Sequence, residues 1–115
     1  MSILAACMVP HPPMIVPEVG RGSERQIAAT QEAYECAARF IAAFRPETII
    51  ISSPHTVMYA DYFHLSPGHE AEGSFAQFRA AQVSFREKYD EDLVKAAERI
   101  AAAEPPFVVT SRSQT

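Results

Sequence analysis

The chain has 115 residues, a length that suits one domain. Apolar residues make up 48% of it, which excludes a disordered chain, and the formal net charge of −4 argues against nucleic-acid binding. No apolar run reaches the roughly 20 residues that span a bilayer, and no basic segment precedes the first run, so we expect neither a membrane span nor a signal peptide. The two cysteines, Cys7 and Cys36, imply no disulfide framework, and we expect a cytoplasmic protein.

Two apolar runs predict buried strands. Residues 3–9 form a continuous run that Pro10 ends, because proline cannot donate to a ladder. Residues 47–52 contain three consecutive isoleucines, which favour a central strand covered on both sides. With a helix between them, the two runs predict a βαβ unit with a right-handed crossover, so the strands run parallel and end at the same edge of a sheet.

The intervening segment predicts a helix from Ser23 to Phe44. Ser23–Gln26 has the pattern of a capping box, and Pro46 stops the helix because the residue before a proline avoids the α region. The apolar stripe that is expected to pack against the sheet comprises Ile27, Ala33, Tyr34, Ala37, Ala38, Phe40, Ile41 and Phe44.

The middle of the chain has a weaker pattern. Residues 62–66 are expected to form a short strand, and residues 83–85 a further one, because apolar side chains alternate weakly there. The segment between them, residues 67–81, has turn-forming and charged residues and is expected to run over the surface.

A second helix is predicted after Asp90. This aspartate is expected to be its N-cap, and the acidic first turn that follows is favourable to the helix dipole. Residues 105–106 are both proline and end the helix, and residues 107–109 begin a third apolar strand. The side chains expected on the buried face of this helix are Leu93, Ala97 and Ile100.

These elements predict an α/β fold with three layers, α/β/α, around a mainly parallel or mixed sheet. We expect residues 1–115 to form a single domain that contains the N-terminal portion of such a sheet. Since the third strand has only begun where the sequence ends, the sheet is expected to be truncated. Its uncovered apolar surface predicts a homo-oligomer.

Two histidines follow the predicted strands in matching contexts, His11 after Pro10 and His55 after Pro54. Because parallel strands end at the same edge of a sheet, we expect both imidazoles at that edge, where open α/β sheets bind their ligands. Neutral imidazole is a common ligand of zinc and iron, so the pair predicts metal ligation. The alternative is that each histidine caps a strand end and bonds to backbone.

The sequence resembles the class III extradiol ring-cleaving dioxygenases of the LigB type. The resemblance is carried by His11-Pro12-Pro13, by Ser53-Pro54-His55, and by the order and spacing of Met8–Gly20, Ile50–Pro67 and Gly73–Asp90. The sequence is more similar still to the LigB-like domain of the AmmeMemoRadiSam group, near the Memo proteins. Only the N-terminal part of that longer domain has a counterpart in this sequence.

The resemblance implies a mononuclear non-haem Fe(II), with zinc as another possible metal, held by two histidines and one carboxylate. It implies a catecholic substrate and O2 at the open metal positions. His11 and His55 match the two histidine ligands, whereas the family's carboxylate ligand and acid/base histidine have no matching position here. Pro12 and Tyr59 are the candidates for the substrate pocket, and simple packing is the alternative for Tyr59.

The remaining histidines and Cys7 are not favoured as ligands or nucleophiles. His64 lies in an aromatic run and is expected to pack, and His69 lies in a glycine-flanked loop and is expected to be solvated. A trio of His69, Glu70 and Glu72 is a less favoured source of the missing carboxylate. Cys7 is expected to be a small buried hydrophobe.

The sequence therefore favours an aromatic ring-opening extradiol dioxygenase that uses non-haem Fe(II), or an incomplete N-terminal portion of one. The alternative is a non-catalytic, Memo-like domain that binds a metal or another protein. The missing third ligand and acid/base histidine leave the enzymatic assignment open.

Overall fold

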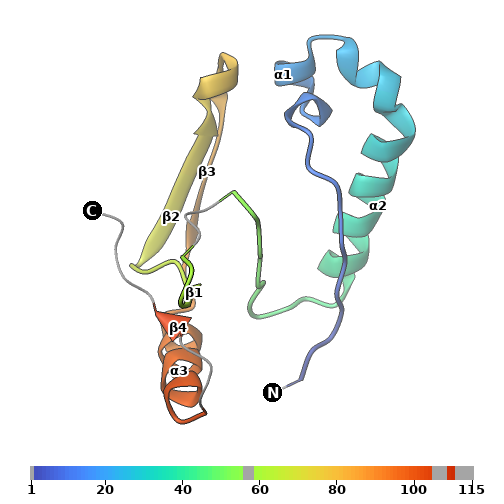
Figure 1. Cartoon of the computed structure of the whole chain (residues 1–115). Helices are drawn as coiled ribbons and strands as arrows, with labels where there is room; N and C mark the ends of the chain where they lie inside the picture. Colours follow the sequence, from blue (N-terminus) through green and yellow to red (C-terminus); the bar gives the residue numbers. More distant parts are fainter. Residues whose placement is uncertain (1, 56–58, 105–108, 111–115) are drawn as a thin grey trace. The chain divides into compact units, whose positions relative to one another are not determined.

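The computed structural model describes residues 2–55, 59–104 and 109–110. These residues form a mixed α/β structure with helices and small two-stranded sheets (Figure 1). The chain divides into two compact units, one made of Met1–Ile49 and Gly73–Phe85 and the other of Ile50–Glu72 and Arg86–Thr115. The expected single domain stays a prediction.

The helical part of the first unit begins with the 3-10 turn η1 (Pro13–Ile15) and the short helix α1 (Pro17–Gly20). A proline opens each of them, because its missing N–H falls where a helix has no acceptor for one. The 3-10 turn η2 (Ser23–Ile27) then leads into helix α2 (Ala28–Ala43), which ends at Phe44 as predicted from Pro46.

The predicted capping box at Ser23–Gln26 is wrong. Gly22 is the N-cap of η2 with a φ of 101°, and no side chain caps either η2 or α2. Instead, the Oε2 atom of Glu24 accepts a hydrogen bond of 2.7 Å from the Gly22 N–H. This carboxylate satisfies a backbone N–H that would otherwise lack a partner at the start of the helical segment.

The two apolar runs at residues 3–9 and 47–52, predicted as parallel strands, have no strand structure in the described part of the chain. Both are largely uncovered, with exposed fractions of 90% for Ile3, 101% for Met8 and 84% for Ile51. A strand needs a neighbouring backbone to complete its hydrogen bonds. Neither segment has such a neighbour among the described residues, so β propensity alone does not produce a ladder.

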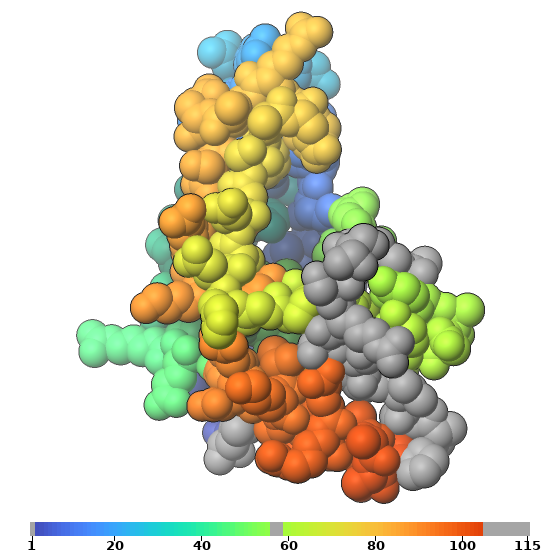
Figure 2. Space-filling view, turned by 90° about the vertical axis from the view of Figure 1, so that its left-hand side faces the viewer, coloured from blue at the N-terminus to red at the C-terminus, as the bar shows by residue number. Residues whose placement is uncertain are grey.

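The largest sheet in the described residues is a hairpin of β2 (Glu70–Phe75) and β3 (Ala80–Lys88), joined by the 3-10 turn η3 (Ala76–Phe78). The strands run antiparallel (Figure 1), and Arg79 closes the turn with a left-handed φ of 59°. The predicted excursion over residues 67–81 does lie at the surface, since its residues up to Arg79 are exposed or half-buried, but most of it is regular structure that the prediction missed. The space-filling view shows the two strands side by side, β2 in yellow and β3 in orange (Figure 2).

A second sheet joins β1 (Phe63–His64) to β4 (Val109–Thr110). The two strands are parallel, and Phe63 lies opposite Val109 and His64 opposite Thr110. The predicted short strand within residues 62–66 is confirmed. The predicted third strand is confirmed at Val109, and the rest of it lies outside the described residues.

Helix α3 (Glu91–Ala102) begins where it was predicted. The Asp90 side chain accepts a hydrogen bond of 3.0 Å from the Leu93 N–H, as an N-cap should. Leu93 and Ala97 are half-buried, but Ile100 is 61% exposed, so its predicted burial is wrong.

The described residues have little buried core. Only Ala80 is buried among them, and no helix in this part of the chain is long and apolar enough to cross a membrane. Many large apolar side chains are exposed instead: Ile3, Leu4, Met8, Tyr34, Phe40, Phe44, Ile49, Ile50, Ile51, Phe63, Phe78, Phe85 and Ile100. So large an exposed apolar area is typical of surfaces that other protein segments cover.

Candidate functional site

His11 lies in the first unit, immediately before the turn η1. Its side chain is exposed. The following Pro12 is half-buried and extended, with φ −68° and ψ 132°, and its carbonyl accepts a hydrogen bond of 3.0 Å from the Ile15 N–H. Proline geometry and this turn restrict the backbone next to His11, which limits the directions that its imidazole can take.

The residues that precede His11 line one side of an open apolar groove of about 550 Å³. It lies between the end of the first apolar run and one side of α2, which run side by side (Figure 1). Cys7 lines this groove as an exposed free thiol, so its predicted burial is wrong. The groove is lined by Cys7, Met8, Val9, Pro10, Ala29, Thr30, Ala33, Tyr34 and Ala37.

His55 lies in the second unit, in a turn after the isoleucine run. Its side chain is exposed, and its backbone N–H donates a hydrogen bond of 3.2 Å to the Ser53 Oγ. No group of three or more His, Cys, Asp or Glu side chains that could hold a metal ion exists among the described residues. The described residues therefore contain no complete iron or zinc site.

Aromatic rings gather around His64 in the second unit. The rings of Tyr59 and Tyr62 stack with centroids 4.3 Å apart and planes 20° apart. Tyr59 also tilts against the His64 imidazole, with centroids 5.8 Å apart and planes at 50°. The Nδ1 atom of His64 is buried and has no hydrogen-bond partner in the described structure. The aromatic run predicted that His64 packs, but nothing in the sequence indicated this unpaired nitrogen.

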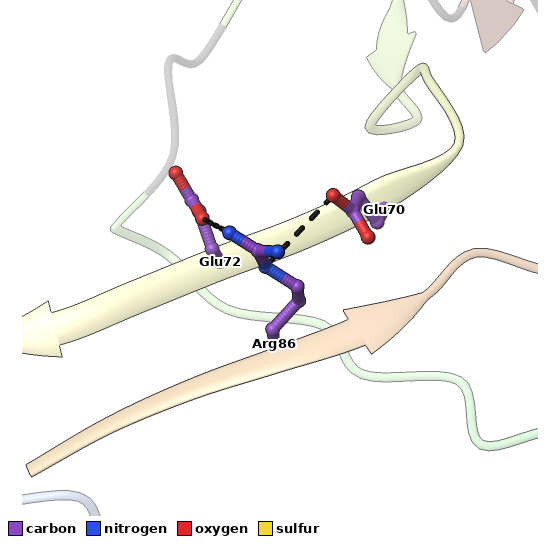
Figure 3. Close-up of polar contacts among 3 residues, drawn as sticks. All are labelled: Glu70, Glu72 and Arg86. Carbon is purple, nitrogen blue, oxygen red and sulfur yellow. Dashed lines mark hydrogen bonds and ion pairs between the residues drawn. The ribbon is translucent and has the colours of Figure 1, made fainter.

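A charged cluster lies at the open end of the β2–β3 hairpin (Figure 3). Arg86 reaches from β3 to two carboxylates on β2: its Nη2 lies 2.8 Å from Glu72 Oε2, and its Nε lies 3.8 Å from Glu70 Oε1. His69 instead places its Nδ1 atom 2.8 Å from Glu91 Oε2, at the start of α3. The alternative ligand trio of His69, Glu70 and Glu72 is therefore wrong, because Arg86 and Glu91 hold these side chains.

Comparison with known proteins gives the family. Residues 5–113 match the model of LigB, the catalytic LigB subunit of aromatic ring-opening dioxygenase. A relative from Clostridium acetobutylicum, named Protein CA_C1420, is 42% identical over 104 residues. The match covers 90% of this chain but 22% of the relative, so the chain spans about a fifth of that protein's length. No solved structure matches the chain. Since the family match covers nearly all of the sequence, the chain belongs to the LigB family of aromatic ring-opening dioxygenase catalytic subunits.

Proposed function

We propose that this chain forms part of an extradiol dioxygenase that opens catechol-type aromatic rings with O2. The observation that carries the proposal is the family match over residues 5–113, which includes both Pro-His sequences. His11 and His55 are exposed imidazoles beside proline-containing turns, and such a backbone suits ligands that must keep one direction. Pro12 and Tyr59 are proposed to lie near the bound substrate.

The metal proposed for this site is Fe(II). Two imidazoles and one carboxylate leave coordination positions free for substrate and O2, whereas structural zinc sites use four protein ligands. His11 and His55 would supply the imidazoles. The carboxylate would come from additional protein, either a longer chain such as the relative has or a second copy of this chain.

The exposed apolar runs also support a proposal about the fold and the assembly. We propose that residues 3–9 and 47–52 become neighbouring strands of a three-layer α/β/α sheet, within a single domain, when further protein covers them. Their exposed isoleucines and Met8 support this proposal, as they do self-association of the isolated chain into a homo-oligomer. The free thiols of Cys7 and Cys36 support a reducing, cytoplasmic location.

Metal content and oxygen uptake test the function. In its self-associated form, where a second copy can supply the carboxylate, the wild-type chain loaded anaerobically with Fe(II) is expected to retain iron after desalting, and His11→Ala and His55→Ala are each expected to retain less than about a tenth of it. His69→Ala is the matched control, because His69 is exposed and pairs with Glu91. Equal iron in all four proteins would contradict the ligand assignment.

A second candidate function is a Memo-like domain that binds a metal or a partner protein without ring cleavage. The lack of a three-ligand group among the described residues and the exposed apolar side chains favour it. The two functions differ in one measurement: when catechol is added to the Fe(II)-loaded protein, a dioxygenase consumes O2 and a binding domain does not.

A further inference from the structure

The side chain of Gln31 joins helix α2 to the turn η1, which follows His11. Its Nε2 atom donates a hydrogen bond of 3.3 Å to the Ile15 carbonyl, and the two residues lie 16 positions apart in the sequence. Both residues are half-buried. The bond is therefore partly shielded from water, which makes it stronger than the same bond at an open surface. It fixes the end of η1 to a helix of 16 residues.

Two prolines make the connection from Ile15 back to His11 stiff. A proline fixes its own φ, and it restricts the residue before it to extended backbone. The second restriction applies to His11, which precedes Pro12, and to Pro12, which precedes Pro13. Pro12 has the extended conformation that this restriction predicts, with φ −68° and ψ 132°. Since the backbone between them has little freedom to rotate, a restraint on Ile15 also restrains the backbone of His11.

Helix α1 contacts the same turn. Gly20 ends α1, and a Cβ at this position would lie 2.5 Å from the Met14 carbonyl oxygen and 2.6 Å from the Glu24 Oε2 atom. Both distances are shorter than an ordinary van der Waals contact, so only glycine lets α1 approach the η1 backbone this closely. The turn is therefore packed against α1 and hydrogen-bonded to α2, and these two contacts together limit its position.

We infer that Gln31 is a positioning residue for His11: by holding Ile15, it keeps the backbone in the conformation that presents the His11 imidazole to a metal ion. The inference rests on the proposed function, in which His11 is an Fe(II) ligand. A ligand that is already restrained loses less conformational freedom when the ion binds, so more of the interaction energy appears as affinity. Gln31 acts through η1 and is not itself a ligand.

Amide hydrogen exchange on the metal-free chain, measured by NMR, tests the restraint. Gln31→Met keeps the length and helix propensity of the side chain but has no N–H donor. It is expected to speed exchange at Ile15 and Val16, whose N–H groups close η1, about twofold to tenfold, the effect of one hydrogen bond. The amides of α2 and α3 are expected to be unchanged, and they report whether the variant keeps its fold. Gln26→Met, the same substitution at an exposed residue of η2, is the matched control.

Anaerobic calorimetric titration with Fe(II) tests the effect on metal binding. In its self-associated form, Gln31→Met is expected to bind Fe(II) about twofold to tenfold more weakly than wild type, because the conformation that presents His11 is less populated. Gln31→Lys keeps an N–H donor and is expected to restore the wild-type affinity within about twofold. The lysine charge by itself would repel the ion, so restoration by this variant identifies the hydrogen bond, rather than charge, as the cause.

Unchanged exchange at Ile15 and Val16 in Gln31→Met, or an equal increase in Gln26→Met, would overturn the inference. So would wild-type Fe(II) affinity in Gln31→Met despite faster exchange in η1, or failure of Gln31→Lys to restore either property. The outcome also separates the inference from the proposed function. If His11→Ala binds Fe(II) like the wild type, the proposed function fails, and hydrogen exchange still decides whether Gln31 holds η1. If His11→Ala loses Fe(II) but Gln31→Met does not, only this inference fails.

Discussion

The β2–β3 hairpin and the apolar run of residues 3–9 show how differently strand-forming sequence can behave. The hairpin has few apolar residues, yet it forms a ladder because η3 brings its two strands together within a few residues. Residues 3–9 are entirely apolar, yet they form no strand, since no backbone among the described residues pairs with them. For these two segments the presence of a partner backbone decides strand formation more than β propensity does, and the parallel pair of β1 and β4 shows that such a partner can lie far away in sequence.

The largest expected effect concerns self-association through the exposed apolar run of residues 47–52. Ile51→Lys places a charge on a side chain that is 84% exposed, and it is expected to weaken self-association at least about tenfold because the charge would be buried at the contact. Ser52→Lys is the matched control, since Ser52 is the exposed polar neighbour. Light scattering coupled to size-exclusion chromatography measures the assembly. A monomeric wild-type chain at all concentrations would contradict the proposed covering of this run.

A smaller effect, on the free energy of unfolding, is expected at the start of α3, where neighbouring residues in the sequence stabilise the helix end. Asp90→Ala removes the side chain that accepts from the Leu93 N–H and is expected to cost about 1 kcal/mol of unfolding free energy. Asp90→Asn keeps an accepting oxygen and is expected to cost much less. Urea unfolding followed by circular dichroism measures both. An equal loss in the two variants would show that the charge, rather than the cap, stabilises the helix.

The smallest effect is expected in the hairpin. Arg86→Met removes the ion pairs with Glu70 and Glu72, and these side chains are all more than a third exposed. Exposed ion pairs contribute about 0.2–1 kcal/mol and are screened by salt, so the loss is expected to be small and to disappear near 1 M NaCl. Arg39→Met, which breaks the longer pair with Glu35, is the control and is expected to cost less.

The local features of the fold could be predicted from the sequence. Asp90 caps α3, Pro46 follows the end of α2, and β1 lies within residues 62–66, because each depends on neighbouring residues. Strand β2 was missed because Ala71 and Gly73 alternate with charged residues and give a weak apolar pattern. The strand needs glycine at position 73, because a Cβ there would lie 2.8 Å from the Phe85 ring, which covers this position.

For the candidate site, too, some features could be predicted from the sequence and others could not. The Pro-His pattern and the predicted parallel strands singled out His11 and His55 as candidate metal ligands, and the place of Tyr59 after His55 made it a candidate pocket residue; these three assignments stay predictions. The unpaired nitrogen of His64 could not be predicted, since it depends on rings that only the folded chain brings against it. The missing carboxylate ligand has no signal in these residues.

The central claim is that His11 and His55 belong to one metal site. Anaerobic calorimetric titration with Fe(II) tests it most directly, on wild type, His11→Ala, His55→Ala and the double variant. If both imidazoles bind the same ion, each single variant is expected to lose as much affinity as the double variant, because one remaining imidazole holds the metal weakly. Losses that add independently, or affinities equal to wild type, would contradict a shared site.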